Sequence, residues 1–546
     1  MIAILVSVLL LLPTFAGLGN LMERFLGKIF NGISSTIILG ICGLSCIWTI
    51  IAFFAPLNQY TEIITLVLGW FFFVKNRLYL PLLTIFSENK VLITFFGLII
   101  VLIGSFAPFI LDHFGYYVPS ILWLKDYGLV KGIANLDLIL GQMSVWHILQ
   151  AGFSHFSDAF LRLNTVLLLV YLMYIAERKV WIHLIFFPFL LFFLQSPSPD
   201  LPVIIFSLIL LQEVFIGNKN STLILGLSAF VFMIKPTMIW LPVFSFLYSF
   251  FILKTNWRNY ILGSLVLVLF FIKNLWTFGY PVFPVSIIDF NLPWKPQDSI
   301  LQDSSKMAIL KTYDVQYSYE EILKFTFWDY PKNWLSLTGL KSFINIAFIL
   351  SLSIFTVFAL IKKKKLYSFL YIAVLIKAVL VLAFSAQYRF FIDVFFVLVF
   401  VLFYQKINKK TSIAISSVLC ICVLTVFSYP KVLQLAVPSF RLSNFMRPFQ
   451  WKQLYQPNTY QLNKYHTFKI GALTFNVSKN YPFNFDTPIP AISTAYLFDD
   501  EKYGIIPQPV DSTNFKKGFK WKKMSKQEQL EAQKIIQFLE NSQPSK

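Results

Sequence analysis

The chain has 546 residues, of which 57 % are hydrophobic and only 13 % are charged, and its mean hydropathy is +0.68. A soluble globular chain is about 25 % charged, so this composition excludes a soluble protein and indicates a polytopic membrane protein. The formal net charge of +20 does not predict a nucleic-acid partner, because the aromatic residues lie in apolar segments and the Lys and Arg residues mostly between them.

Apolar runs recur along the chain and predict an all-α protein with about 14 transmembrane helices, since about 20 apolar residues cross a bilayer. Several runs are shorter than this and would be tilted or partly re-entrant. The segment 78–86 is too short to span and would lie flat on the membrane. The expected spans are 2–18, 33–55, 61–74, 91–111, 158–176, 181–194, 201–215, 222–234, 238–253, 260–278, 341–361, 366–386, 390–404 and 411–428.

Lys and Arg residues in alternate short loops, such as Arg24, Lys28 and Lys362–Lys365, predict which loops are cytoplasmic. The opposite side then carries the long loops 112–157 and 279–340 and the tail 429–546. Hydrophobic periodicity in the tail is weak until Ser525 and Glu528, which form a capping-box pattern that predicts a helix over 526–540. In a bacterium this side is the periplasm or the cell exterior.

Asp112 stands where the fourth expected span leaves the membrane, followed by His113 and the interface aromatics Tyr116 and Tyr117. A lone Asp at such a position often only ends a helix in water. Other polar residues, however, fall at or just below the same outer helix ends. Ionisable groups near membrane depth are costly and usually line a cavity or pair with each other. The polar residues at these outer helix ends, besides Asp112 and His113, are Asp200, Lys235, Lys273, Gln387 and Arg389.

Each of these residues has a structural alternative, because Lys235 and Arg389 can snorkel and Lys273 can pair with Asp200. Their gathering on one side of the membrane nevertheless favours a shared polar cavity. Lys235, Lys273 and Arg389 would suit a lipid-linked phosphate or diphosphate, which Arg can bind bidentately.

The expected chemistry is the transfer of a sugar from a lipid-phosphate carrier. Asp112, helped by His113, would accept the proton of an attacking hydroxyl as general base. The cations, with Gln387 beside them, would stabilise the leaving phosphate.

An Asp directly after a transmembrane helix, in the first large outer loop, resembles the GT-C superfamily of integral-membrane glycosyltransferases. The stretches 116–119, 123–136, 196–200, 279–284 and 486–490 are similar to a largely uncharacterised bacterial branch of that superfamily. This resemblance implies an irregular helix bundle, a polyprenyl-phosphate or polyprenyl-diphosphate sugar as donor, and a glycan or lipid acceptor at the outer face of the cytoplasmic membrane. It also adds Tyr280 and Asp200 to the expected site.

The resemblance implies three regions: N-terminal transmembrane helices (1–90), a GT-C-like catalytic module (91–428) and a C-terminal extracytoplasmic domain (429–546). It further implies an amphipathic helix lying flat on the outer surface after Asp112, which residues 117–126 fit. The chain departs from the family pattern at Tyr117, where a His is expected, and at Lys273, where an Arg is expected. The tail also lacks cysteines before 488–490.

Two other function classes fit some of these features. A transporter or flippase of lipid-linked glycans would also have a basic internal cavity, but transporters commonly contain inverted repeats, and the sequence shows no such repeat. A polymerase or ligase of lipid-linked glycans would not need an Asp at the start of the first loop.

Asp112 and Asp200 would suit a divalent metal, but they form no tight motif, and we expect no metal or other cofactor. The four cysteines lie in apolar runs without metal-site spacing: Cys42, Cys46, Cys420 and Cys422.

Overall fold

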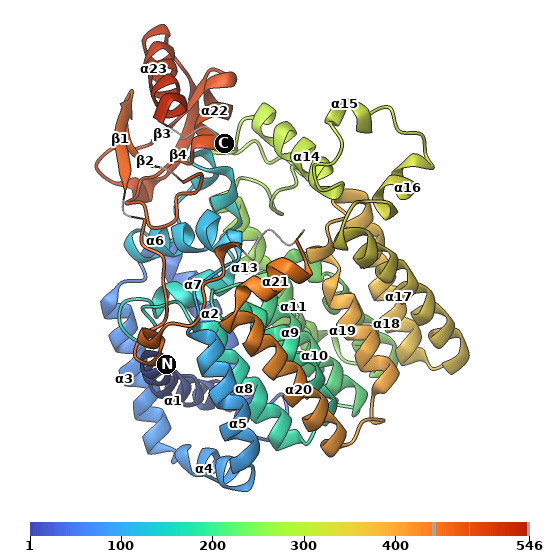
Figure 1. Ribbon diagram of the computed structural model, residues 1–546. Coiled ribbons are helices and arrows are strands. Elements are labelled where there is room, and N and C mark those ends of the chain that lie inside the picture. The colour runs from blue at the N-terminus through green and yellow to red at the C-terminus, as the bar shows by residue number, and fades with distance from the viewer. Residues whose placement is uncertain (439–443, 463, 480, 543–546) are drawn as a thin grey trace.

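The computed structural model describes residues 1–438, 444–462, 464–479 and 481–542, and helices make up most of it (Figure 1). The helices of the first half are α1 (Ile2–Leu26), α2 (Ile33–Phe54), α3 (Gln59–Lys75), α4 (Tyr79–Glu88), α5 (Lys90–Gly104), η1 (His113–Tyr117), α6 (Val118–Asp126), α7 (Val145–Gly152), α8 (Leu163–Arg178), α9 (Phe187–Leu190), α10 (Asp200–Phe215), α11 (Ser221–Ile234), α12 (Trp240–Leu247) and α13 (Ile261–Thr277). Those of the second half are α14 (Asp298–Thr312), α15 (Tyr319–Ile322), α16 (Asp329–Leu335), α17 (Leu340–Lys362), α18 (Lys365–Phe384), η9 (Tyr388–Phe390), α19 (Ile392–Phe403), α20 (Lys409–Ser428), α21 (Pro430–Ala436), α22 (Thr494–Lys502) and α23 (Lys526–Ser542).

Six helical segments in the described part of the chain are long and apolar enough to cross a membrane: α1, α2, Trp257–Thr277, α17, α18 and α20. Helices α3 and α4 form a seventh candidate, bent by 73°, and α4 covers the segment 78–86. The composition and these helices together fit a multi-pass membrane protein. Their number is smaller than the 14 spans predicted, because several of the expected spans form shorter apolar helices such as α5, α11 and α19.

The expected span 91–111 shows why such runs break. Helix α5 ends at Gly104, seven residues early, and Pro108 follows. A proline disfavours helical geometry in the residue before it. Gly104 also lies so close to α8 that a Cβ atom there would come 2.4 Å from the Thr165 hydroxyl. Asp112 therefore follows an irregular segment instead of a continuous helix.

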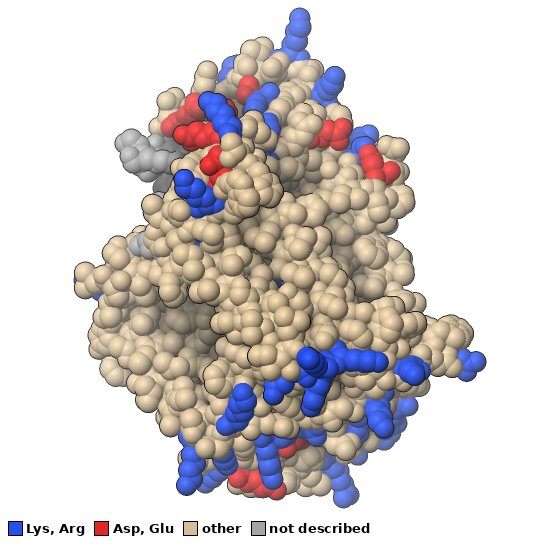
Figure 2. All heavy atoms as spheres, turned by 90° about the vertical axis from the view of Figure 1, so that its right-hand side faces the viewer, with Lys and Arg blue, Asp and Glu red and all other residues tan. Residues whose placement is uncertain are grey.

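The two ends of the bundle differ in charge. Figure 2 shows Lys and Arg gathered at one end, a broad band without charged side chains above it, and acidic and basic residues mixed at the other end. We call the first the Lys-rich end; its residues include Lys28, Lys75, Lys254, Lys362 and Lys409. The opposite end, which carries Asp112 and the tail, is the Asp112 end.

The tail adds strands to the helical fold, so the protein is not all-α. Strand β1 (Tyr465–Ile470) pairs antiparallel with β2 (Leu473–Ser478), and β3 (Ile505–Pro509) pairs antiparallel with β4 (Phe519–Lys523). The predicted C-terminal helix is confirmed as α23. The Ser525 backbone N–H donates to Glu528 Oε2 (2.9 Å), and the Glu528 N–H donates to Ser525 Oγ (3.3 Å), which completes the capping box.

The tail covers α6, at the top of the bundle in Figure 1. The expected helix after Asp112 is present, but its apolar residues Ile121, Trp123 and Leu124 are buried in protein, which corrects the expectation that it lies on the surface. The Trp123 ring packs edge-on against Phe515 and Phe519. Lys516 Nζ donates to the carbonyl oxygens of Ala52 (2.7 Å) and Leu129 (3.0 Å), which ties the tail to α2 and the loop after α6.

A buried carboxylate also anchors the tail. Asp137, in the loop before α7, accepts hydrogen bonds from the Asn484 side chain and from the Ser493 backbone N–H (3.2 Å). Burial raises the pKa of Asp137 well above its usual range, and these two hydrogen bonds lower it only in part. Burial, then the neighbouring Asp137, raises the pKa of Asp500 in the same way.

These shifts predict that the tail docks more firmly in mild acid. A carboxyl with a raised pKa stays protonated in the folded state after the unfolded chain has lost its proton. The contribution of such a carboxyl to the stability of the docked tail is therefore complete below the ordinary Asp pKa of about 3.9. It falls as pH rises toward the folded pKa, by about 1.4 kcal/mol for each unit of difference between the two pKa values. Hydrogen exchange of residues 484–500 should show more protection at pH 5 than at pH 8. In Asp137→Asn this difference should shrink, and an unchanged pH dependence in that variant would refute the assignment.

Candidate functional site

An ion pair that is open to solvent joins Asp112 to Arg389. Asp112 directly precedes η1, and Arg389 lies in η9, the short turn between α18 and α19. Arg389 Nη1 lies 3.1 Å from Asp112 Oδ2, and the two side chains are 41 % and 31 % exposed. Solvent-exposed ion pairs contribute only about 0–1 kcal/mol. A bound ligand can therefore replace this contact at small cost.

A second ion pair, between Asp200 and Lys235, adjoins the first. Asp200 is the first residue of α10 and Lys235 follows the last residue of α11, so each charge suits the dipole of its helix end. Lys235 has an extended backbone, as expected for a residue before proline. Lys235 Nζ also donates to the Arg389 carbonyl oxygen (3.3 Å), which links the two pairs into one network.

A third, buried pair fixes the helices on both sides of Arg389. Lys377 of α18 pairs with Asp393 of α19, and their side chains are only 1 % and 7 % exposed. Trp240 Nε1 donates to Asp393 Oδ2 (2.7 Å), which adds α12 to the contact. Lys377 also interacts electrostatically with Lys235 and Asp200. This buried pair therefore holds in place the two helices that flank Arg389.

Lys311, an exposed lysine near the end of α14, adds positive charge near Arg389 and Asp112. Desolvation by surrounding protein, then the nearby Arg389, lowers the pKa of Lys311, while Asp112 raises it. Helix α14 is held there by two hydrogen bonds to the segment before η9: Ser385 Oγ donates to the Ala308 carbonyl (3.2 Å), and the Ala386 N–H donates to Thr312 Oγ1 (3.1 Å). No local sequence pattern singles out Lys311, because it lies in a long loop of mixed composition.

Tyr116 and Tyr117 form the aromatic side of the site. Both are buried in η1, with their ring centroids 4.7 Å apart, and Tyr117 packs against His147 at 4.7 Å. Burial first, and then nearby acidic groups including Asp112 and Asp200, raises the pKa of both tyrosines well above the usual range. Their hydroxyl groups therefore keep their protons and can serve as hydrogen-bond donors.

His113 and Lys273 lie outside the ion-pair network. His113 is buried against the rings of Phe114 and Phe485, and burial, Arg162 and His147 lower its pKa well below the usual range. Lys273 Nζ donates to the carbonyl oxygens of Gln142 and Met143, both at 2.9 Å. The expected alternative pairing of Lys273 with Asp200 is therefore wrong, because backbone oxygens already satisfy this ammonium group.

Gln387 and Tyr280 have other local partners. Gln387 Nε2 donates to Ser385 Oγ (2.7 Å), next to the turn that carries Arg389. Tyr280 is buried and lines a separate cavity of about 570 Å³ together with Asp298, Ser305 and Tyr319. Within the described ranges no group of three or more His, Cys, Asp or Glu residues could hold a metal ion.

The buried pair predicts a strong effect on stability. Lys377→Ala would leave Asp393 charged and unpaired in the interior, which typically costs about 3–5 kcal/mol. The matched control is Lys365→Ala, an exposed lysine at the other end of α18, expected to change stability by less than about 0.5 kcal/mol. Thermal unfolding of the detergent-solubilised variants measures this difference. Equal stability of the two variants would contradict the role assigned to the pair.

The chain belongs to a family described as a domain of unknown function, DUF8201, which matches residues 1–396. The matched range includes all three ion pairs, Asp112–Arg389, Asp200–Lys235 and Lys377–Asp393, whereas the C-terminal tail lies outside it. No curated protein and no solved structure matches the chain.

Proposed function

We propose that this member of the family is an integral-membrane glycosyltransferase of the GT-C type. It would transfer a sugar from a polyprenyl-phosphate or polyprenyl-diphosphate donor to a glycan or lipid acceptor of the cell envelope. The observation that carries the proposal is the solvent-open Asp112–Arg389 pair, joined to Asp200–Lys235 at one end of an apolar bundle. A carboxylate and several cations at the edge of a membrane are what a lipid-phosphate sugar requires.

When the sugar donor binds, Arg389 and Lys235 exchange their carboxylate acceptors for phosphate oxygens. Arg389 and Lys235 now donate to carboxylates, and a lipid-linked phosphate offers them other anionic acceptors, with the planar Arg fork suited to two phosphate oxygens. Lys311 adds a third positive charge from α14. When Arg389 turns to the phosphate, Asp112 loses its hydrogen-bond donor, and its carboxylate oxygens become free to accept from the acceptor hydroxyl. Donor binding thus prepares the base.

The chemical step follows from this arrangement. Asp112 accepts the proton of the acceptor hydroxyl while that oxygen attacks the anomeric carbon of the sugar. The bond between the anomeric carbon and the phosphate oxygen breaks, and the phosphate leaves with the electron pair. Arg389, Lys235 and Lys311 stabilise the charge that develops on it. A single displacement of this kind inverts the configuration of the anomeric carbon.

The membrane placement belongs to the same proposal. The Lys-rich loops indicate that the opposite, Asp112 end faces the periplasm or exterior of a bacterial cytoplasmic membrane. Shorter segments such as α5, α10 and α11 would complete about 14 crossings by tilting or by joining broken halves. The lipid-linked sugar is a substrate, and the proposed chemistry needs no metal or other cofactor.

Asp112→Asn should abolish sugar transfer, because the amide cannot accept the hydroxyl proton. The expected loss is about 10²–10⁴-fold, with thermal unfolding close to that of the unaltered protein. The assay follows release of polyprenyl phosphate from a polyprenyl-phosphate sugar by the purified protein. Asp126→Asn, an exposed carboxylate at the end of α6, is the matched control and should retain activity. Transfer at the normal rate by Asp112→Asn would rule out Asp112 as the base.

Arg389→Ala and Lys235→Ala should each weaken binding of polyprenyl phosphate at least about tenfold, which corresponds to 1.4 kcal/mol. Arg389→Lys should fall between, since it keeps the charge and loses the fork. The control is Lys332→Ala, an exposed lysine on α16 outside the network. Unchanged binding in both alanine variants would leave these cations as structural partners and bring back the transporter or flippase alternative.

A further inference from the structure

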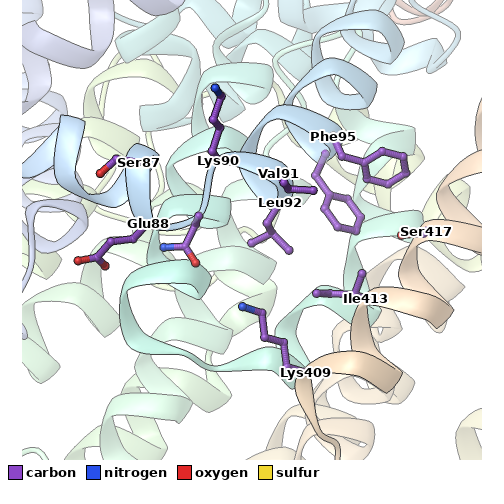
Figure 3. Close-up of a pocket in the computed structure, with 11 residues that line it drawn as sticks. Ser87, Glu88, Lys90, Val91, Leu92, Phe95, Lys409, Ile413 and Ser417 are labelled. Atoms are coloured by element: carbon purple, nitrogen blue, oxygen red, sulfur yellow. The ribbon is translucent and has the colours of Figure 1, made fainter.

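A second cavity lies at the Lys-rich end, far from the ion-pair network. It has a volume of about 440 Å³ and lies between the elbow of α4 and α5 and the first turns of α20 (Figure 3). The elbow forms because α4 ends at Glu88 and α5 starts at Lys90, with α4 already bent by 73° from α3. The two segments leave a notch that α20 closes from the other side.

One side of this cavity is apolar and open to the surroundings. Val91 is 83 % exposed, and Phe95 and Ile413 continue the wall beside it, while Leu92 and Phe96 are buried beneath. In a membrane this wall faces lipid chains. Figure 3 shows Phe95 and Ile413 on one side of the cavity and Glu88 on the other.

The other side carries charges without partners. Among the described residues, neither Lys90 nor Lys409 forms an ion pair with a carboxylate, in contrast to the cations of the Asp112 end. Lys409 Nζ lies 4.6 Å from the centre of the Trp181 ring, a cation–π contact that holds its amine near the cavity. Figure 3 shows Lys409 reaching toward the elbow. Glu88 lines the same cavity, so two lysines and one glutamate leave one net positive charge.

We propose that this cavity binds a glycerophospholipid whose head group carries one net negative charge, such as phosphatidylglycerol. The phosphate lies by Lys409, and Lys90 swings its flexible stem toward it, while one acyl chain follows Val91, Phe95 and Ile413. Basic pockets between transmembrane helices are known to hold anionic head groups. The apolar wall specifies a lipid and not a free phosphate. This inference is independent of the proposed enzymatic activity.

Native mass spectrometry of the full chain with added phosphatidylglycerol tests the site. Lys409→Ala should lower the affinity for the lipid about fivefold, the effect expected for one lysine near an anionic head group. The matched control is Lys365→Ala, because Lys365 begins α18 as Lys409 begins α20, and both are exposed at the same end. Glu88→Gln should raise occupancy, since it removes the opposing charge.

Competition with other ligands distinguishes an anionic-lipid site from a plain anion site and from an unselective lipid groove. Phosphatidylcholine should bind more weakly than phosphatidylglycerol, and inorganic phosphate should not displace the bound lipid. Equal occupancy in Lys409→Ala and Lys365→Ala would overturn the proposal. So would displacement by inorganic phosphate, which would identify a plain anion site, or equal binding of phosphatidylcholine, which would identify an apolar lipid groove without charge selection.

Discussion

Charge pairing between the ends of different helices holds the Asp112 end together. Asp200 begins α10, Lys235 ends α11, and Arg389 lies between α18 and α19, yet all three meet beside Asp112. Charged groups in apolar surroundings need partners, so each break in an apolar run that exposes a charge also requires a neighbour of opposite sign. The positions of the helix ends, and thus the shape of the site, depend on this requirement.

The three ion pairs differ in burial, and the role of each pair follows from how deeply it is buried. Lys377–Asp393 is enclosed and holds α18 and α19 in place. Asp112–Arg389 is open to solvent and contributes little to stability. Asp200–Lys235 lies between these extremes and connects them. The exposed contact between Asp112 and Arg389 can therefore be replaced without disturbing the buried pair Lys377–Asp393.

Much of this arrangement could be predicted from the sequence, and the exceptions have physical reasons. Asp112, Asp200, Lys235 and Arg389 each interrupt an apolar run, so alternation of the runs places them on one side. Lys377 and Asp393 are lone charges within the runs 366–386 and 390–404, and such charges indicate a buried pair. Fewer long helices form than the apolar runs suggest, because Pro108 and the close contact at Gly104 shorten helices that composition alone would extend. The strands of the tail and the place of Lys311 depend on tertiary contacts that no local pattern encodes.

The central claim is that Arg389 and Lys235 form a lipid-phosphate site at the Asp112 end. An experimental structure of the protein in lipid nanodiscs with polyprenyl phosphate tests it most directly. The account predicts phosphate density within hydrogen-bond distance of both cations, with the Asp112–Arg389 contact broken and Asp112 facing the open space. Phosphate density elsewhere, with the 3.1 Å contact between Asp112 and Arg389 intact, would contradict it.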